Sequence, residues 1–249
     1  MLGPPLAAAL ALAAGAARAP AFTAVLDPGH GGELTGAVSP RGDLEKDLTL
    51  QIARRVKRRL EALGGRVVLT RAGDTRVPLA NRAAVANALE ADLFISIHLN
   101  SMPTEAARRV SSGVETYFLS ADASDAGAEA SAARENADRL AGEPAPDPDD
   151  PVAGILDDLQ AAAVLSGSSR LAYAVQDKLV TALQAENRGV KQAPFYVLAG
   201  ARMPAVLLEL GFISNEAEAA RLKTPERQER IAAAVAAGVA AWRAGERRH

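Results

Sequence analysis

Short apolar runs alternate with amphipathic segments along most of this chain, and this alternation restricts the folds open to it. The apolar runs have the length of buried strands and lie at residues 22–26, 67–69, 93–97 and 114–119. Strands that alternate with helices form a parallel sheet with helices on both faces. We therefore predict an α/β fold: a single domain with a mostly parallel twisted sheet flanked by helices.

The helices are predicted from a repeat of apolar residues every three to four positions. In the first helix this repeat runs from Leu44 to Leu60, and we expect Asp43 to be its N-cap and Gly64 to end it. Further strands are expected at residues 195–198 and 205–210. Further helices are expected at residues 78–90, 155–165, 169–186 and 225–244.

Composition excludes several classes of function. The chain contains no cysteine, which excludes disulfides, thiolate metal ligands and a cysteine nucleophile. The net charge of -2 gives no reason to expect a nucleic-acid partner, which requires a basic face. After the N-terminal segment, the sequence has no stretch long and apolar enough to predict a membrane span.

Residues 1–19 have the pattern of a signal peptide. The apolar run from Leu6 to Ala17 is too short to cross a membrane but fits the central region of a secretion signal. Ala17, Arg18 and Ala19 match the small-residue pattern of a cleavage site. We therefore expect export to the periplasm or cell envelope, with residues 20–249 as the folded domain.

Two histidines follow apolar strands. His30 comes after the run at 22–26 and its glycine-rich turn, and His98 comes directly after the run at 93–97. Ligands gather beyond the carboxyl ends of parallel strands, so this placement favours a shared site. Each histidine, taken alone, is also compatible with a structural role in which its hydrogen bonds are satisfied.

Two glutamates are candidates for the same site. Glu45 lies at the start of the first helix, where the helix dipole alone also favours an acidic residue. Beside two histidines, it would complete a His, Glu, His zinc shell with a fourth position open. Glu209 lies inside an apolar strand, where burial is costly unless the carboxylate is paired. A structural ion pair explains it, as does a general base beside a metal-activated water.

Other polar residues near these segments receive structural interpretations. Gly29, Gly31 and Gly32 are expected to let the backbone bend so that His30 points inward. Arg71 and Arg82 can bind a substrate carboxylate or form structural ion pairs, and we favour the structural interpretation.

Four segments in order resemble the zinc-dependent N-acetylmuramoyl-L-alanine amidases of the type 3 amidase family. They are VLDPGHGG at residues 25–32, EKD at 45–47, SIHLN at 96–100 and LELGFISN at 208–215, and the resemblance spans residues 22–245. One departure is Leu99, where the family usually has alanine; we expect it to be harmless.

The resemblance implies an amidase catalytic domain with one zinc ion, acting on peptidoglycan in cell-wall turnover or daughter-cell separation. The reaction is hydrolysis of the amide between N-acetylmuramic acid and L-alanine. By motif, His30, Glu45 and His98 match the zinc ligands, and Glu209 matches the catalytic glutamate. Two alternatives remain open: a catalytically silent wall-binding regulatory protein on the same fold, and a zinc peptidase that cuts a different stem-peptide bond.

A long insertion at residues 121–168 separates the strand predicted at 114–119 from the helix predicted at 169–186. Residues 132–137 resemble part of a helix that covers the zinc in the cell-division branch of the family. The resemblance implies a lid, with Glu135 in the open zinc position, Glu143 as second choice, and an activator protein that displaces the lid. A flexible surface loop is the alternative.

Overall fold

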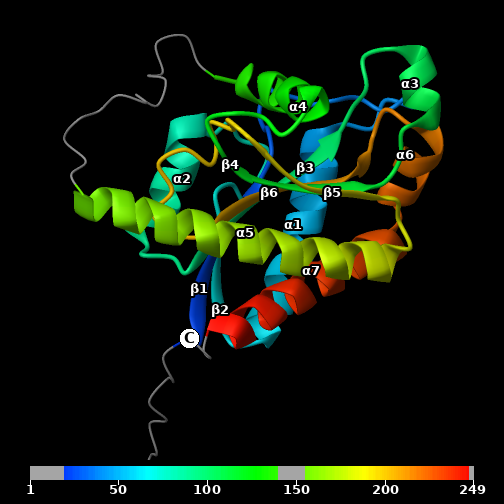
Figure 1. Cartoon of the computed structure of the whole chain (residues 1–249). Coiled ribbons are helices and arrows are strands. Elements are labelled where there is room, and N and C mark those ends of the chain that lie inside the picture. Colours follow the sequence, from blue (N-terminus) through cyan, green and yellow to red (C-terminus); the bar gives the residue numbers. More distant parts are fainter. Residues whose placement is uncertain (1–19, 140–154, 247–249) are drawn as a thin grey trace, which may run out of the picture.

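The computed structural model describes residues 20–139 and 155–246, and it contains one six-stranded sheet in the order β2-β1-β3-β6-β4-β5 (Figure 1). Every pairing between neighbours is parallel except that of β4 with β6. The strands are β1 Phe22–Pro28, β2 Gly65–Leu69, β3 Leu93–Asn100, β4 Val114–Leu119, β5 Asn187–Ala193 and β6 Ala205–Phe212. The predicted mostly parallel α/β sheet is confirmed.

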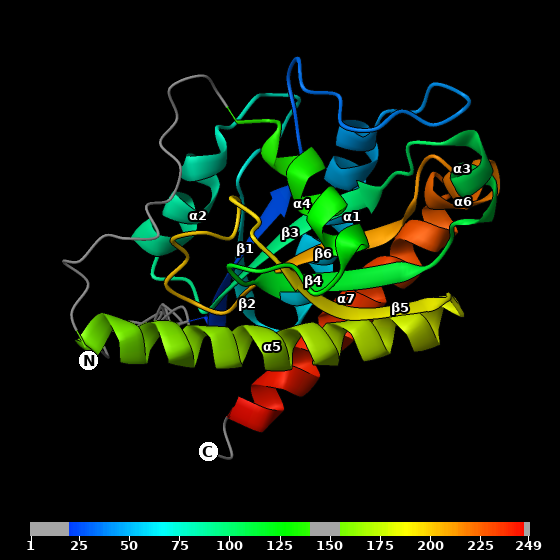
Figure 2. The ribbon, with the colours of Figure 1, turned by 45° about the horizontal axis from the view of Figure 1, so that its top comes forward.

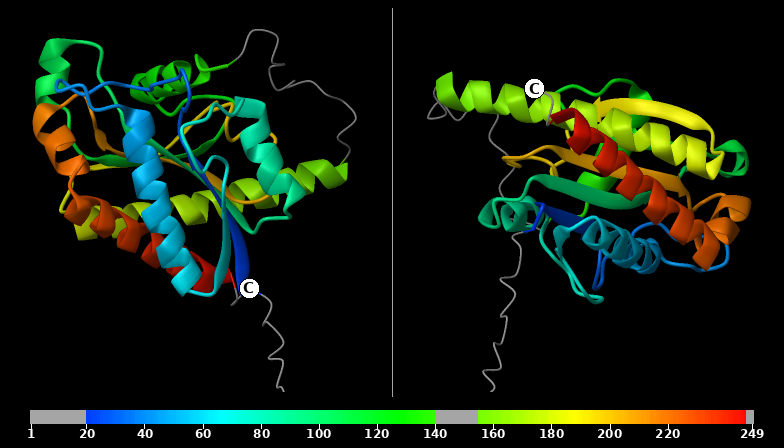
Figure 3. Two further views of the ribbon diagram at one scale, coloured as in Figure 1. Left: turned by 180° about the vertical axis from the view of Figure 1, so that it is seen from behind. Right: turned by 90° about the horizontal axis from the view of Figure 1, so that it is seen from below.

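Helices cover both faces of the sheet. On one face α7 packs against α1 and α5, and on the other α2 and α4 lie over the strands (Figures 1 and 3). The described helices are α1 Glu45–Ala62, α2 Leu79–Ala88, α3 Glu105–Val110, α4 Ala126–Asn136, α5 Ile155–Leu183, α6 Glu216–Leu222 and α7 Pro225–Glu246. In this region no helix is long and apolar enough to span a membrane.

The start of α1 differs from the prediction. Its N-cap is Leu44, which offers no side-chain oxygen, and the predicted cap Asp43 is instead bound to Ser39 and Lys223. The Glu45 N–H is satisfied by the Ala37 carbonyl at 3.0 Å. The preceding loop therefore caps α1 through its backbone and holds the first turn of the helix against the end of the sheet.

Two further elements depart from the prediction. Residues 195–198 form a turn, whereas β5 lies just before them, and its half-buried sequence carries no apolar run. The helices expected at 155–165 and 169–186 are one continuous helix, α5. Gly167 lies within it because a Cβ there would come within 2.7 Å of Pro204. The glycine permits a close approach and does not break the helix.

The carboxyl ends of β1, β3 and β6 lie at one edge of the sheet, since these three strands are parallel. The antiparallel β4 begins at that same edge, and Glu115 near its start pairs in register with Glu209. Alternation along β3 sends Ile97 and Leu99 into the core beneath α1, α5 and α7, and His98 to the opposite face. The predicted site residues therefore meet at this edge, on the face that α4 covers.

Candidate metal centre and active site

The turn after β1 brings His30 back over the sheet edge. His30 has a φ of 60°, an uncommon conformation for a residue with a side chain, and Arg82 fixes it by donating to the His30 carbonyl at 2.9 Å. Gly29 passes directly over the His98 ring, where a Cβ would overlap the ring atoms. The glycine-rich turn thus directs His30 inward, as the sequence predicted.

The two arginines near this turn are structural. Arg82 forms a fully buried ion pair with Asp27, with 2.9 Å between Nη1 and Oδ1. Arg71 donates to the carbonyls of Pro28 and Gly29 at 2.9 and 2.7 Å. Both side chains donate hydrogen bonds to backbone carbonyl oxygens of the bent turn, which confirms the structural interpretation.

Four buried side chains direct one atom each toward a common centre. The atoms are His30 Nε2, Glu45 Oε1, His98 Nδ1 and Glu135 Oε2, and all lie within 4.8 Å of one another. Glu45 Oε1 is 3.1 Å from His30 Nε2 and 3.3 Å from His98 Nδ1, while Glu135 Oε2 is 3.4 and 2.9 Å from the same atoms.

Three of these four atoms have no hydrogen-bond partner among the described residues, namely those of His30, His98 and Glu135. Buried polar atoms without partners are rare, and here they converge on one point. A tetrahedral zinc shell, with bonds of about 2.0–2.1 Å, separates its ligand atoms by about 3.3–3.4 Å. The four separations given above and the two-nitrogen, two-oxygen donor set are therefore compatible with zinc.

Glu45 is held in place by backbone donors. Its Oε2 accepts from the Ala37 N–H at 2.9 Å, and its Oε1 accepts from the Leu99 N–H at 2.8 Å. The Leu99 side chain lies in the core on the opposite face of the sheet, so only its backbone reaches the site. Replacing the family's usual alanine with leucine therefore leaves the contact with Glu45 unchanged.

The cluster perturbs the proton affinity of its members. Burial lowers the pKa of His98, but the carboxylates of Glu135 and Glu45 outweigh it and raise the pKa to about 9. The pKa of His30 is also raised, because Glu45, Asp138 and Glu135 outweigh its burial. Burial raises the pKa of Glu45, and the two histidines more than reverse this effect. Without a metal, the carboxylates thus favour protonated histidines.

Asp138 is a residue that sequence reasoning missed. Its Oδ2 accepts from His30 Nδ1 at 2.6 Å, on the side of the ring opposite to the cluster. A carboxylate behind a ligating histidine fixes the ring and its tautomer, and it makes the other nitrogen a better ligand. The available signal was its position three residues after Glu135, next to the end of the same helix.

Glu209 lies beside His98 in the register of β6 and β3, and its side chain is 0 % exposed. Burial raises the pKa of Glu209 well above its usual range, and Glu135 adds to this effect while Arg134 opposes it. Arg134 Nη2 is 3.4 Å from Oε1, and Oε2 has no partner among the described residues. A carboxylate with raised pKa and a free oxygen beside a metal cluster is suited to moving protons.

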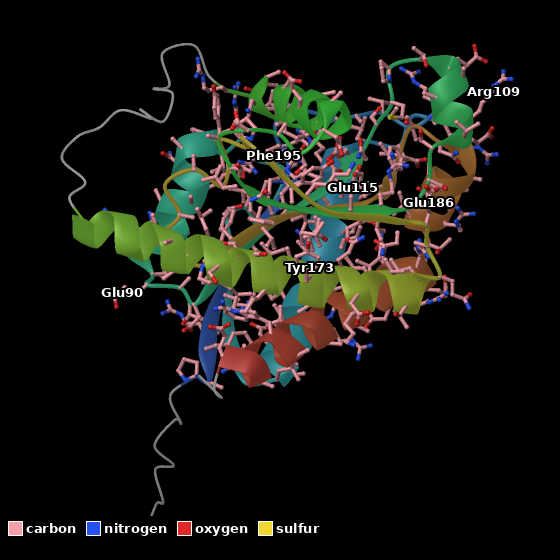
Figure 4. The ribbon with its side chains drawn as sticks, viewed as in Figure 1. Glu90, Arg109, Glu115, Tyr173, Glu186 and Phe195 are labelled. Atoms are coloured by element: carbon pink, nitrogen blue, oxygen red, sulfur yellow. The ribbon has the colours of Figure 1, made fainter. Side chains whose placement is uncertain are left out.

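A second buried carboxylate, Glu115, follows on β4, beneath α4 in Figure 4. It accepts a hydrogen bond from Asn100 and lies 2.9 Å from Lys191 Nζ. A row of His98, Glu209 and Glu115 therefore runs across three strands. Sequence reasoning missed Glu115 because its partners come from distant elements.

Helix α4 lies across the cluster and contacts it through its C-terminal turn. Its buried residues are Ala128, Ser131, Ala132 and Glu135, which share one helical face. Arg134 reaches Glu209, the Ser101 carbonyl and Asn100, and Asn136 accepts from the Tyr196 N–H at 2.9 Å. The structure thus places Glu135 in one cluster with His30, Glu45 and His98, whereas Glu143 lies outside the described residues.

Comparisons with known proteins identify the family of this chain. The family model described as N-acetylmuramoyl-L-alanine amidase matches residues 24–241. The amidase AmiA of Escherichia coli is 38% identical over 220 residues, which cover 88% of this chain and 75% of the relative.

Solved amidase structures have the same fold. The N-acetylmuramoyl-L-alanine amidase of Clostridium difficile 630 superimposes with a TM-score of 0.70 at 27% identity, covering 92% of this chain and 100% of that one. The CwlD amidase of Clostridioides difficile, solved in complex with the GerS lipoprotein, gives a TM-score of 0.67 at 26% identity, covering 90% and 99%. This chain therefore belongs to the N-acetylmuramoyl-L-alanine amidase family.

Proposed function

We propose that this chain hydrolyses the amide between N-acetylmuramic acid and L-alanine in peptidoglycan, using zinc held by His30, Glu45 and His98. The observation that carries the proposal is the convergence of buried, unpartnered ligand atoms beside the buried carboxylate of Glu209. This donor set supports zinc and matches the pattern of catalytic sites, in which three protein ligands leave one position for water or substrate.

The roles of the chain's own residues follow from their placement. Zinc supplies Lewis acidity, which activates water at neutral pH and polarises a carbonyl oxygen. Glu209 accepts the proton from the attacking water and passes it to the departing nitrogen of L-alanine. The sheet holds Glu209 next to His98, so the proton carrier keeps a fixed distance from the metal ligands. Asp138 orients the His30 ring.

Residues 121–168 act in this proposal as an autoinhibitory insertion. Glu135 occupies the ligand position that water or substrate needs, and Arg134 pairs with the carboxylate that must take up a proton. Activity then requires that α4 leaves the sheet, and a partner that binds the displaced arrangement would shift the population toward it. The complex of the CwlD amidase with a lipoprotein supports a protein partner of this kind.

The place of action follows from the substrate. A peptidoglycan amidase acts in the periplasm or cell envelope, and the signal-peptide pattern at residues 1–19 supports export, although those residues lie outside the described part. We place the catalytic domain at residues 20–249 and the activity in cell-wall turnover or daughter-cell separation.

Digestion of purified muropeptides with and without a metal chelator, analysed by mass spectrometry, tests the proposal. We expect release of the intact stem peptide with L-alanine at its N-terminus, loss of this product with chelator, and recovery on adding zinc. Cleavage inside the stem peptide would instead identify a zinc peptidase. If no cleavage occurs even after Glu135→Ala weakens the contact of α4 with the cluster, the result would favour a catalytically silent wall-binding protein.

A further inference from the structure

Two hollows meet beside the metal centre. The first, of about 630 Å³, is bordered by His30, Glu45 and Glu135. The second, of about 780 Å³, lies between the loop at residues 38–41, α3 and α6, and α3 and α6 lie side by side in Figures 1 and 2. Val38 and Arg108 border both hollows, so together they form one groove that leads away from the metal ligands.

Arginines concentrate along this groove. Arg108 stands where the hollows meet, and Arg41 and Arg109 border the outer one. Arg41 pairs with Glu216 and Arg109 with Glu105, but all four side chains are more than half exposed. Exposed pairs of this kind contribute little to stability, but they leave both arginines with a carboxylate partner within the chain.

Arg108 differs from Arg41 and Arg109 because none of the residues that the structure describes offers it a carboxylate partner. Its Nε donates to the Met102 carbonyl at 2.7 Å, which anchors the side chain. Among the described residues, no acceptor is assigned to its two terminal nitrogens. An anchored guanidinium with a free pair of donors is suited to bidentate binding of a carboxylate.

The chemistry of the proposed substrate indicates which part would occupy the groove. The glycan side is uncharged, because the lactyl carboxyl is consumed in the scissile amide. The peptide side carries carboxylates, the first on the D-glutamate after L-alanine, which is linked through its side chain and leaves its α-carboxylate free. Two residues span about 7 Å, which places this group within the groove that begins at the metal ligands.

Building on the proposed function, we propose that Arg108 is a specificity-determining residue that binds the free α-carboxylate of the second stem-peptide residue. The groove from the metal centre to α3 and α6 then holds the peptide side of the substrate. A substrate amidated at that position offers a neutral carboxamide and loses the charge-assisted contact.

The test compares two N-acetylmuramoyl tripeptides that differ only in this group, which is an α-carboxylate in one and an α-carboxamide in the other. Both are assayed with the full wild-type chain and with the full chain that carries Glu135→Ala. We expect kcat/KM to favour the carboxylate by about tenfold, mainly through KM. Arg108→Gln should bring the ratio to about one by weakening only the carboxylate substrate. Arg108→Lys should retain part of the preference.

Arg109→Gln is the matched control, because it removes the same charge from the same helix (Figure 4) and leaves the junction of the hollows unchanged. It should keep the wild-type ratio. The proposal is overturned if the wild-type chain has no preference, if Arg108→Gln lowers both substrates equally, or if Arg109→Gln also abolishes the ratio. Hydrolysis of neither tripeptide would overturn the proposed amidase function, and the subsite with it.

Discussion

Glu209 and His98 are in-register neighbours on adjacent parallel strands, so the sheet places their backbones side by side. The backbones of the proposed proton carrier and of a proposed metal ligand are therefore positioned by the hydrogen bonds of the sheet. Helix α4 contributes Arg134 and Glu135 to the site but no strand, so we expect its displacement to leave the register of β3 and β6 in place. Substitutions in the sheet therefore test the catalytic step, and substitutions in α4 test how the activity is regulated.

Replacing the proton carrier tests the chemistry. We expect Glu209→Gln to lower turnover by about a hundredfold or more, since the amide cannot accept a proton, and to leave zinc content unchanged. Release of stem peptide and bound zinc per chain are the measurements. Glu90→Gln, on an exposed residue remote from the site, serves as control. Full activity of the Glu209 variant would exclude the assigned role.

Weakening the contacts of α4 with the cluster tests whether this helix inhibits the enzyme. We expect Glu135→Ala to raise basal hydrolysis about tenfold or more, because a lost contact of about 1.4 kcal/mol changes an equilibrium by that factor. Arg134→Ala should raise it less, since Glu135 stays at the cluster. Glu129→Ala on the exposed side of the same helix should have no effect. If all three variants match the wild-type rate, α4 does not restrain the enzyme.

Two glycines with positive φ separate backbone strain from damage to the metal centre. A Cβ on Gly36 would overlap the His30 ring and come within 2.7 Å of Glu45 Oε2, whereas a Cβ on Gly42 meets nothing within 4 Å. Gly36→Ala should therefore lower zinc affinity by about tenfold or more, while Gly42→Ala costs about 1–2 kcal/mol of stability and keeps the affinity. Competition with a chelating dye measures the zinc affinity of both variants, and denaturant unfolding measures their stability. Equal affinities would show that the loop adapts.

Zinc uptake should depend on pH in a defined direction. The Glu135 and Glu45 carboxylates raise the pKa of His98 to about 9, and a ligating histidine must first lose its proton. Affinity should therefore rise with pH up to about 9, with release of protons measurable by calorimetry in buffers of different ionisation enthalpy. Glu135→Ala removes the larger of these electrostatic causes, so the rise should move to lower pH. An affinity that does not change with pH would contradict this prediction.

The same shift has the opposite effect on the metal-free fold. A histidine whose pKa is raised in the folded state contributes stability below its unfolded value of 6.5. That contribution is lost as the pH rises from 6.5 to about 9. Denaturant unfolding of the metal-free chain across this range should show falling stability, and saturating zinc should reverse the trend.

Three residues of the cluster could be predicted from sequence because their signals are local. His30 and His98 follow apolar strands, and Glu45 begins an amphipathic helix, so the ends of secondary structure indicate where the side chains gather. Glu209 was conspicuous as a single carboxylate in an apolar strand. The segment at 132–137 was identified by family resemblance, and its inward face follows from small residues at helical spacing.

The residues that were missed depend on tertiary partners. Asp138 has meaning only where α4 meets His30, and Glu115 only where β4 runs antiparallel beside β6. The strand β5 escaped notice because an edge strand that is half exposed needs no apolar run. Asp43 looked like an N-cap, but its carboxylate is bound by Ser39 and Lys223, and the loop backbone satisfies the helix instead.

Along β3, His98, a proposed zinc ligand, stands between Ile97 and Leu99, which both belong to the hydrophobic core on the other face of the sheet. A slip of one residue in this strand would exchange its two faces. The imidazole would then lie in the hydrophobic core, and an aliphatic side chain would take its place in the proposed zinc site. The alternation of side chains along β3 therefore serves both the packing of the core and the chemistry of the site. A register error that takes His98 away from the cluster would therefore also remove Ile97 and Leu99 from the core.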